Sequence, residues 1–98
     1  MPIRQPWLDF KTEVIKTLPA SSGVFELGDQ AKNVLMIKGA DNMQQTVLEL
    51  KNSGEPSIEK VLYVRFEEEF MYTQRETELL QAYMRVNKKQ PECNDEII

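Results

Sequence analysis

The sequence predicts the α+β fold class, with a small three-stranded sheet, mixed or antiparallel, covered by helices. Two short apolar runs at residues 23–27 and 34–38 are separated by a polar turn, which predicts a hairpin. A third run at residues 61–66 is rich in β-branched and aromatic side chains, which favour strands. Apolar residues at helical spacing before, between and after these runs predict the order α-β-β-α-β-α.

The first part of the chain predicts an extended arm at residues 1–8 and a short helix at residues 9–18. Pro2 and Pro6 disfavour helix within the arm. In the next segment, apolar side chains recur at helical spacing, and Asp9 is a suitable N-cap.

The hairpin is expected to lead into a second helix. Gly39 and Ala40 should end the second strand, and either Asp41 or Asn42 should cap the helix. The apolar stripe of this helix consists of Met43, Val47 and Leu50.

The last helix is predicted from a capping box. Thr73 and Glu76 have the spacing at which a threonine hydroxyl and a glutamate satisfy the free amides of a helix start. We expect the helix to run to about Val86, followed by a polar segment broken at Pro91. Its expected buried face consists of Leu79, Leu80, Tyr83, Met84 and Val86.

The composition indicates one globular domain. At 98 residues there is room for one modest core. We divide the chain into the arm and first helix (1–18), the main domain (19–94) and a tail (95–98). With no histidine and Cys93 as the single cysteine, the sequence excludes an intrachain disulfide and histidine-dependent catalytic triads, and it disfavours a zinc site.

The charge balance and hydropathy bear on the partners. A net charge of −4 disfavours a dedicated nucleic-acid-binding module, because such proteins neutralise phosphates with a positive surplus. No apolar run approaches the roughly 20 residues that cross a membrane, and the first residues lack the features of a signal peptide. We therefore expect a cytoplasmic protein with no membrane partner.

Five short segments carry a resemblance to a known family. They are Gly23-Val24-Phe25, Met36-Ile37-Lys38, Gly39-Ala40-Asp41-Asn42-Met43, Glu78-Leu79-Leu80-Gln81 and Pro91-Glu92-Cys93-Asn94. Over residues 19–94, their order and spacing resemble those of a GIY-YIG nuclease domain. The resemblance implies a GIY-YIG-like scaffold for this part of the chain.

The resemblance also implies that the catalytic residues have been replaced. The family's two tyrosines, its arginine and its metal-binding glutamate fall at Phe25, Met36, Thr46 and Gln81, and its asparagine is retained as Asn94. The amide of Gln81 does not supply the anionic oxygen that a hard divalent cation prefers. Thr46 lacks the bidentate fork of arginine, and neither Phe25 nor Met36 has a phenolic oxygen. We therefore assign no catalytic residue, no metal site and no cofactor; only an active nuclease would require Mg²⁺ or Mn²⁺.

Three functions remain open. The preferred one is a non-catalytic protein-binding or scaffold domain with an unknown protein partner, acting as a monomer or homodimer. The second is a weak nucleic-acid binder that has lost cleavage and uses Lys38, Lys88 and Lys89, although the favoured interpretation of these lysines is as dispersed solubilising charges. The third is an endonuclease that needs a divalent metal and has relocated its ligands. Glu78 is its weak metal candidate, with a solvated helix glutamate as the alternative.

One further residue bears on the preferred function. Trp7 is the single tryptophan and lies on the proline-flanked arm, so it is a candidate interface anchor. It could equally fold back onto its own domain.

Overall fold

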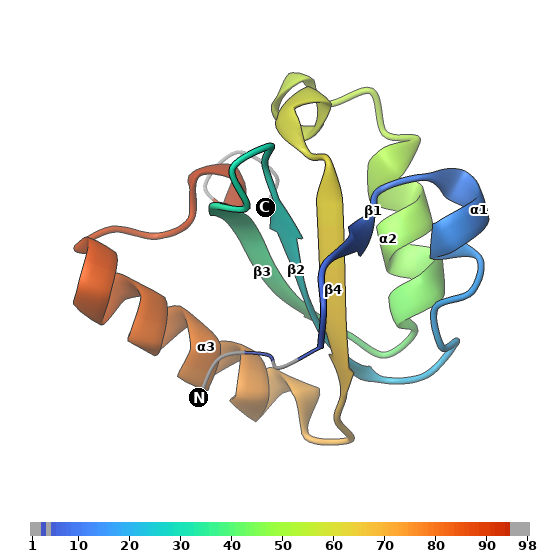
Figure 1. Ribbon diagram of the computed structural model, residues 1–98. Helices are drawn as coiled ribbons and strands as arrows, with labels where there is room; N and C mark the ends of the chain where they lie inside the picture. Colours follow the sequence, from blue (N-terminus) through green and yellow to red (C-terminus); the bar gives the residue numbers. More distant parts are fainter. Residues whose placement is uncertain (1–2, 4, 95–98) are drawn as a thin grey trace.

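The computed structural model describes residues 3 and 5–94, and it contains a four-stranded antiparallel sheet with helices on both faces (Figure 1). The α+β class is confirmed, but the sheet has four strands where three were predicted. The tail at 95–98 and Met1, Pro2 and Arg4 of the arm lie outside the described residues. The elements are β1 Leu8–Asp9, α1 Thr12–Ile15, β2 Gly23–Gly28, β3 Val34–Ala40, α2 Met43–Lys51, η1 Pro56–Lys60, β4 Tyr63–Glu68, α3 Tyr72–Asn87 and η2 Glu92–Asn94.

The strands lie in the order β1-β4-β2-β3, so the chain returns to the middle of the sheet with β4. Helices α1 and α2 cover one face, and α3 covers the other (Figure 1). Among the described residues, no helix is long and apolar enough to span a bilayer.

The fourth strand, β1, forms where the sequence predicted the start of a helix. Leu8 pairs with Val64, and the N–H of Phe10 donates to the carbonyl of Leu62 at 2.9 Å. Because these backbone groups are used by the sheet, the predicted helix at 9–18 shrinks to α1. Asp9 belongs to the strand and is not an N-cap.

The hairpin of β2 and β3 is longer than predicted. Asp29 organises its loop, because one carboxylate oxygen accepts from the N–H groups of Ala31 at 3.0 Å and Asn33 at 2.9 Å. The hydrogen bond from the Asn33 N–H, with a smaller contribution from that of Ala31, holds the pKa of Asp29 below its ordinary value. The predicted break at Gly39 and Ala40 is wrong, since both residues belong to β3. A side chain at Gly39 would meet the Tyr72 carbonyl at 3.0 Å, so glycine there permits the close approach of α3.

Helix α2 agrees with its prediction. Asn42 is the N-cap, and its side chain accepts from the N–H of Gln45 at 3.0 Å. Met43, Val47 and Leu50 are its buried residues, as the apolar stripe predicted.

Helix α3 has nearly the predicted bounds but a different start and a different buried face. Its N-cap position is Met71, and Thr73 lies inside the first turn, so the capping box does not form. The carboxylate of Glu76 accepts from the N–H of Gly39 on β3 instead. Of the five residues predicted to be buried, only Leu79 is buried. The helix axis diverges from the sheet toward its C-terminal end (Figure 1), which exposes the rest to varying degrees.

The core divides into two clusters, one on each face of the sheet. The cluster on the α1 and α2 face includes Phe10 and Ile15 together with Phe25, so residues on both sides of position 18 share one core. The smaller cluster under α3 contains the buried residues Ile3, Val24, Ile37 and Leu79. The smaller cluster fills only part of the space beneath α3, and this partial filling creates the site described next.

Candidate functional site

A groove opens between the C-terminal half of α3 and the sheet, and we call it the α3 groove. Its volume is about 290 Å³, and most of its surface is apolar. It is lined by Glu26, Val34, Ile37, Arg65, Leu79, Ala82, Tyr83, Val86 and Asn87. An apolar groove with a few convergent polar groups is the usual form of a ligand or partner site.

The polar groups of the α3 groove are an ion pair contributed by two adjacent strands. Glu26 of β2 and Arg65 of β4 lie directly opposite each other, and the Arg65 Nε donates to Glu26 Oε1 at 2.6 Å. Glu26 is 3% exposed. Burial raises the pKa of Glu26 above its ordinary value, and the hydrogen bond from Arg65 opposes this shift only in part. A buried carboxyl of raised pKa in a groove is a feature of binding sites as well as of structural networks.

The ring of Trp7 lies over Arg65 of this ion pair. The guanidinium carbon of Arg65 lies 4.3 Å from the centroid of the Trp7 ring, which is cation–π geometry. The same ring lies against Gly28, where an added Cβ would come within 2.9 Å of it. The structure therefore places the half-buried Trp7 against its own sheet.

A second ion pair joins α3 to β4. Arg75 donates to both carboxylate oxygens of Glu67, at 2.7 and 3.2 Å. Its Nη1 also lies 3.6 Å from the carboxylate of Glu78. The candidate ligand Glu78 is thus already paired with a cation, and among residues 3 and 5–94 no group of three or more carboxylate, cysteine or histidine side chains could hold a metal ion.

The four positions that the sequence matched to catalytic residues do not come together. Phe25 and Met36 are buried on the sheet face that α1 and α2 cover. Thr46 is half-buried on α2, whereas Gln81 is exposed on α3, across the sheet. Gln81 is separated from the other three positions because α3 covers the opposite face of the sheet from α2.

The remaining candidates lie at the edges of the fold. The side chain of Asn94 forms two hydrogen bonds with the backbone of Ile37 on β3. Lys38 is half-buried on β3. Lys88 and Lys89 are exposed after the last turn of α3, and Lys88 adopts the left-handed conformation of a helix C-cap, with φ at 64°.

Comparison with known proteins identifies the family of the chain. Residues 1–86 match a family described as "Domain of unknown function (DUF7508)". The chain belongs to this family. The match includes every residue that lines the α3 groove except Asn87, and it also includes Trp7. No curated protein and no solved structure matches the chain significantly.

The sequence analysis missed the ion pair at the floor of the α3 groove. Glu26 is the single charged residue in the otherwise apolar segment 23–28, and in a strand it shares a face with Val24. A carboxylate on an inward face needs a partner. That requirement could have singled out Glu26, but the pairing with Arg65 depends on the register of β4.

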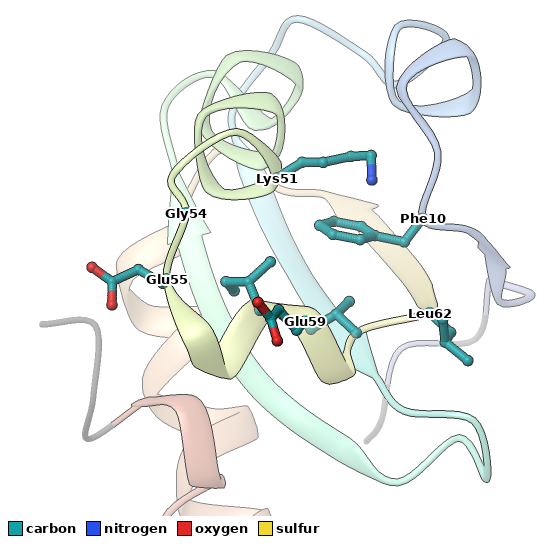
Figure 2. Close-up of a pocket in the computed structure, with 8 residues that line it drawn as sticks. Phe10, Lys51, Gly54, Glu55, Glu59 and Leu62 are labelled. Carbon is teal, nitrogen blue, oxygen red and sulfur yellow. The ribbon is translucent and has the colours of Figure 1, made fainter.

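A second concavity lies at the C-terminal end of α2, with a volume of about 350 Å³. Figure 2 shows Lys51 extending toward the ring of Phe10, while Glu55 points away from it. The Lys51 Nζ is 4.9 Å from the centroid of that ring. The walls of this concavity combine the apolar residues Ile58, Val61 and Leu62 with charged side chains. No buried polar group among its lining residues converges on a ligand, so the α3 groove is the stronger candidate.

Proposed function

We propose that this chain is a non-catalytic protein-binding domain, and that its α3 groove receives apolar side chains from an acidic, amphipathic segment of a partner protein. The observation that carries the proposal is the exposed apolar surface of α3 beside the groove. Val86 is 78% exposed and Met84 is 41% exposed on this helix, next to the half-buried Tyr83. Covering such a surface is favourable by about 25 cal/mol per Å² of apolar area.

The size of the groove favours side chains over a whole small-molecule ligand. Pockets that bury a drug-sized molecule have volumes of roughly 300–1,000 Å³, and the α3 groove is at the lower limit of that range with about 290 Å³. One or two side chains projecting from a partner fit such a volume, in the manner of a helix or loop laid against a groove.

The charges around the groove favour an acidic partner. Arg85, Lys88 and Lys89 are exposed at the C-terminal end of α3. The carboxylate of Glu26 is already neutralised by Arg65. A partner with aspartate or glutamate beside its apolar residues would meet these cations, and electrostatic complementarity of this kind sets orientation and specificity.

The non-catalytic part of the proposal rests on the positions that a GIY-YIG-like scaffold would use for chemistry. Phe25 and Met36 serve as packing residues there, and Gln81 is exposed on the far side of the sheet. A degenerate GIY-YIG-like origin of residues 19–94 remains part of the proposal, supported by the order of the motifs. A relocated metal site at Glu78 is disfavoured because Arg75 would compete with the cation.

The proposal is tested by selecting peptides from a random library displayed on phage against the immobilised protein. A Val86→Asp variant serves for counter-selection. Enriched sequences should combine apolar residues with aspartate or glutamate, and amide NMR shifts on binding should cluster at Leu79, Tyr83 and Val86. Placing a charge at Val86 should weaken binding about tenfold or more, because a buried valine contributes about 1.5 kcal/mol. Leu62→Asp, also at an exposed apolar position but in the other concavity, should bind normally.

Three results would contradict the proposal. Peptides that bind the wild type and the Val86→Asp variant equally would exclude the groove. Salt-dependent binding of a short DNA duplex, with shifts at Lys38, Lys88 and Lys89 that are lost when these become alanine, would favour the nucleic-acid alternative. Nicking of DNA that depends on Mg²⁺ or Mn²⁺ and disappears in Glu78→Gln would favour the nuclease alternative.

A further inference from the structure

The outer edge of β4, beyond the short strand β1, carries the next inference. We infer that this edge binds an extended segment of a partner protein by strand addition, and that the segment alternates apolar and basic side chains. The surface is separate from the α3 groove, so it extends the proposed function to a second contact. The argument starts from the hydrogen-bonding groups at the two edges of the sheet.

The β3 edge of the sheet is closed by side chains. Ile37 and Gly39 direct their backbone groups away from β2. The amide of Asn94 bonds both the N–H and the carbonyl of Ile37 at 2.9 Å, and Glu76 accepts from the N–H of Gly39. An incoming strand would have to displace these contacts, so β3 is a poor site for strand addition.

The β4 edge is covered only in part. The N–H of Glu69 donates to the carbonyl of Ser22 at 3.1 Å on the β2 side. In an antiparallel ladder, alternate residues use opposite sides, so Val64, Phe66 and Glu68 direct their backbone groups outward. Leu62 directs only its carbonyl outward, because its N–H donates to the carbonyl of Gly28 on β2 at 2.9 Å. β1 pairs with Val64, and Phe10 bonds the Leu62 carbonyl. Within the described part of the chain, no backbone hydrogen bond reaches the outward side of Phe66 or Glu68.

The sequence of the arm explains why β1 stops short of Phe66. Continuing the register of Leu8 with Val64 would place Pro6 opposite Phe66. Proline has no N–H to donate to the Phe66 carbonyl. Trp7 also turns onto Arg65, and Ile3 is buried with Val24 beneath α3, so the arm crosses the face of the sheet and leaves its edge.

The side chains along the open edge determine the chemistry of the segment. Phe66 is half-buried and Glu68 is exposed, and both belong to the same face of β4. The next two apolar side chains in sequence are largely exposed, Phe70 at 85% and Met71 at 57%. A strand added here would place one side chain beside Phe66, where an apolar residue packs, and another beside Glu68, where lysine or arginine pairs.

A second copy of the chain is a poorer occupant of this edge than a basic segment. Antiparallel pairing of two β4 edges would bring the acidic residues Glu68 and Glu69 of one copy next to those of the other. Directly opposed like charges destabilise a strand pair, and acidic residues at an edge are a common protection against self-association. A partner segment with lysine at alternate positions converts this repulsion into attraction.

The test uses the full chain and a synthetic peptide of alternating valine and lysine, followed by amide hydrogen exchange and NMR. Binding should protect the amides of Phe66 and Glu68 from exchange and leave the resonances of Val86 unmoved. Glu68→Lys should weaken binding of the valine–lysine peptide several-fold, and it should allow a valine–glutamate peptide to bind instead. Glu13→Lys, an exposed position on α1, is the control and should bind the valine–lysine peptide as the wild type does.

One variant of the protein and one modified peptide separate strand addition from simple charge attraction. Glu68→Pro removes an outward N–H that the β2 ladder does not use, so the fold should persist and binding should fall. A peptide methylated on alternate backbone nitrogens keeps its charges but loses its donors, and should bind much more weakly than its parent. Equal binding of the methylated peptide would overturn the inference, as would unprotected Phe66 and Glu68 amides. If the protein self-associates without peptide, and Glu68→Pro abolishes this self-association, the occupant of the edge is a second copy of the chain and not a basic partner. Because the Val86→Asp variant should bind this peptide normally, failure of either proposal is distinguishable from failure of the other.

Discussion

The side-chain amide of Asn94 pairs with the backbone of Ile37 as a neighbouring strand would. Its Oδ1 accepts from the Ile37 N–H, and its Nδ2 donates to the Ile37 carbonyl, both at 2.9 Å. In the same short 3₁₀ turn, Cys93 is fully buried, and its sulfur lies 3.6 Å from the Ser57 carbonyl. A segment beyond α3 thereby closes the β3 edge.

Replacing Asn94 with alanine should destabilise the fold by about 1–2 kcal/mol, because two partly buried backbone groups lose their partners. Urea unfolding measures this change. Asn87→Ala removes an exposed side chain that bonds the Tyr83 carbonyl within its own helix, and should cost less than about 0.5 kcal/mol. Equal losses in the two variants would show that the Asn94 contact contributes nothing specific.

Glu26 should give the folding free energy a pH dependence that a Glu26→Gln variant lacks. Because burial raises the pKa of Glu26 above 4.5 in the folded protein, the folded state holds the proton more tightly than the unfolded chain does. Its stabilising contribution is complete below the unfolded pKa and is lost as pH rises through the folded pKa. The stability of the wild type relative to the variant should therefore fall as pH rises from below 4.5 toward neutrality. Urea unfolding in steps of pH measures this difference, and a constant difference would contradict the assignment.

Gly28→Ala should displace the Trp7 ring from the sheet, since the added Cβ would lie 2.9 Å from it. Trp7 is the single tryptophan, so its fluorescence reports the change directly, and the emission should shift to longer wavelength as the ring meets water. Gly54→Ala is the control. Its backbone has φ at 76°, so alanine is strained there, but nothing lies near the new methyl group. That variant should lose stability while the emission of the folded protein stays unchanged.

The pair Arg75–Glu67 should show measurable coupling in a double-mutant cycle with Arg75→Ala and Glu67→Gln. Arg75 is largely buried and makes two hydrogen bonds to the carboxylate, so we expect about 1–2 kcal/mol of coupling in the free energy of unfolding. The same cycle on Lys60 and Glu92, whose side chains are 60% and 46% exposed, should give about 0–1 kcal/mol. Coupling no greater than in this exposed pair would mean that the Arg75–Glu67 pair does not anchor α3 to β4.

Local sequence signals predicted the elements whose ends are local. Asn42 caps α2 through a hydrogen bond to a residue three positions away, and the stripe containing Met43 and Val47 follows from helical spacing. Asp9 was misassigned because the backbone next to it pairs with β4, more than fifty residues away in sequence. The capping box at Thr73 failed for the same reason, since Glu76 bonds Gly39 across the fold.

The sequence by itself determined the α+β class, the hairpin, the N-cap and apolar stripe of α2 and, closely, the bounds of α3, because turn residues and apolar periodicity act over a few positions. Only the tertiary structure decided the candidate site. The register of β4 on β2 brings Arg65 opposite Glu26, and the divergence of α3 from the sheet leaves Val86 exposed beside them. Strand register and helix orientation depend on contacts between distant segments, and no local pattern in the chain specifies them.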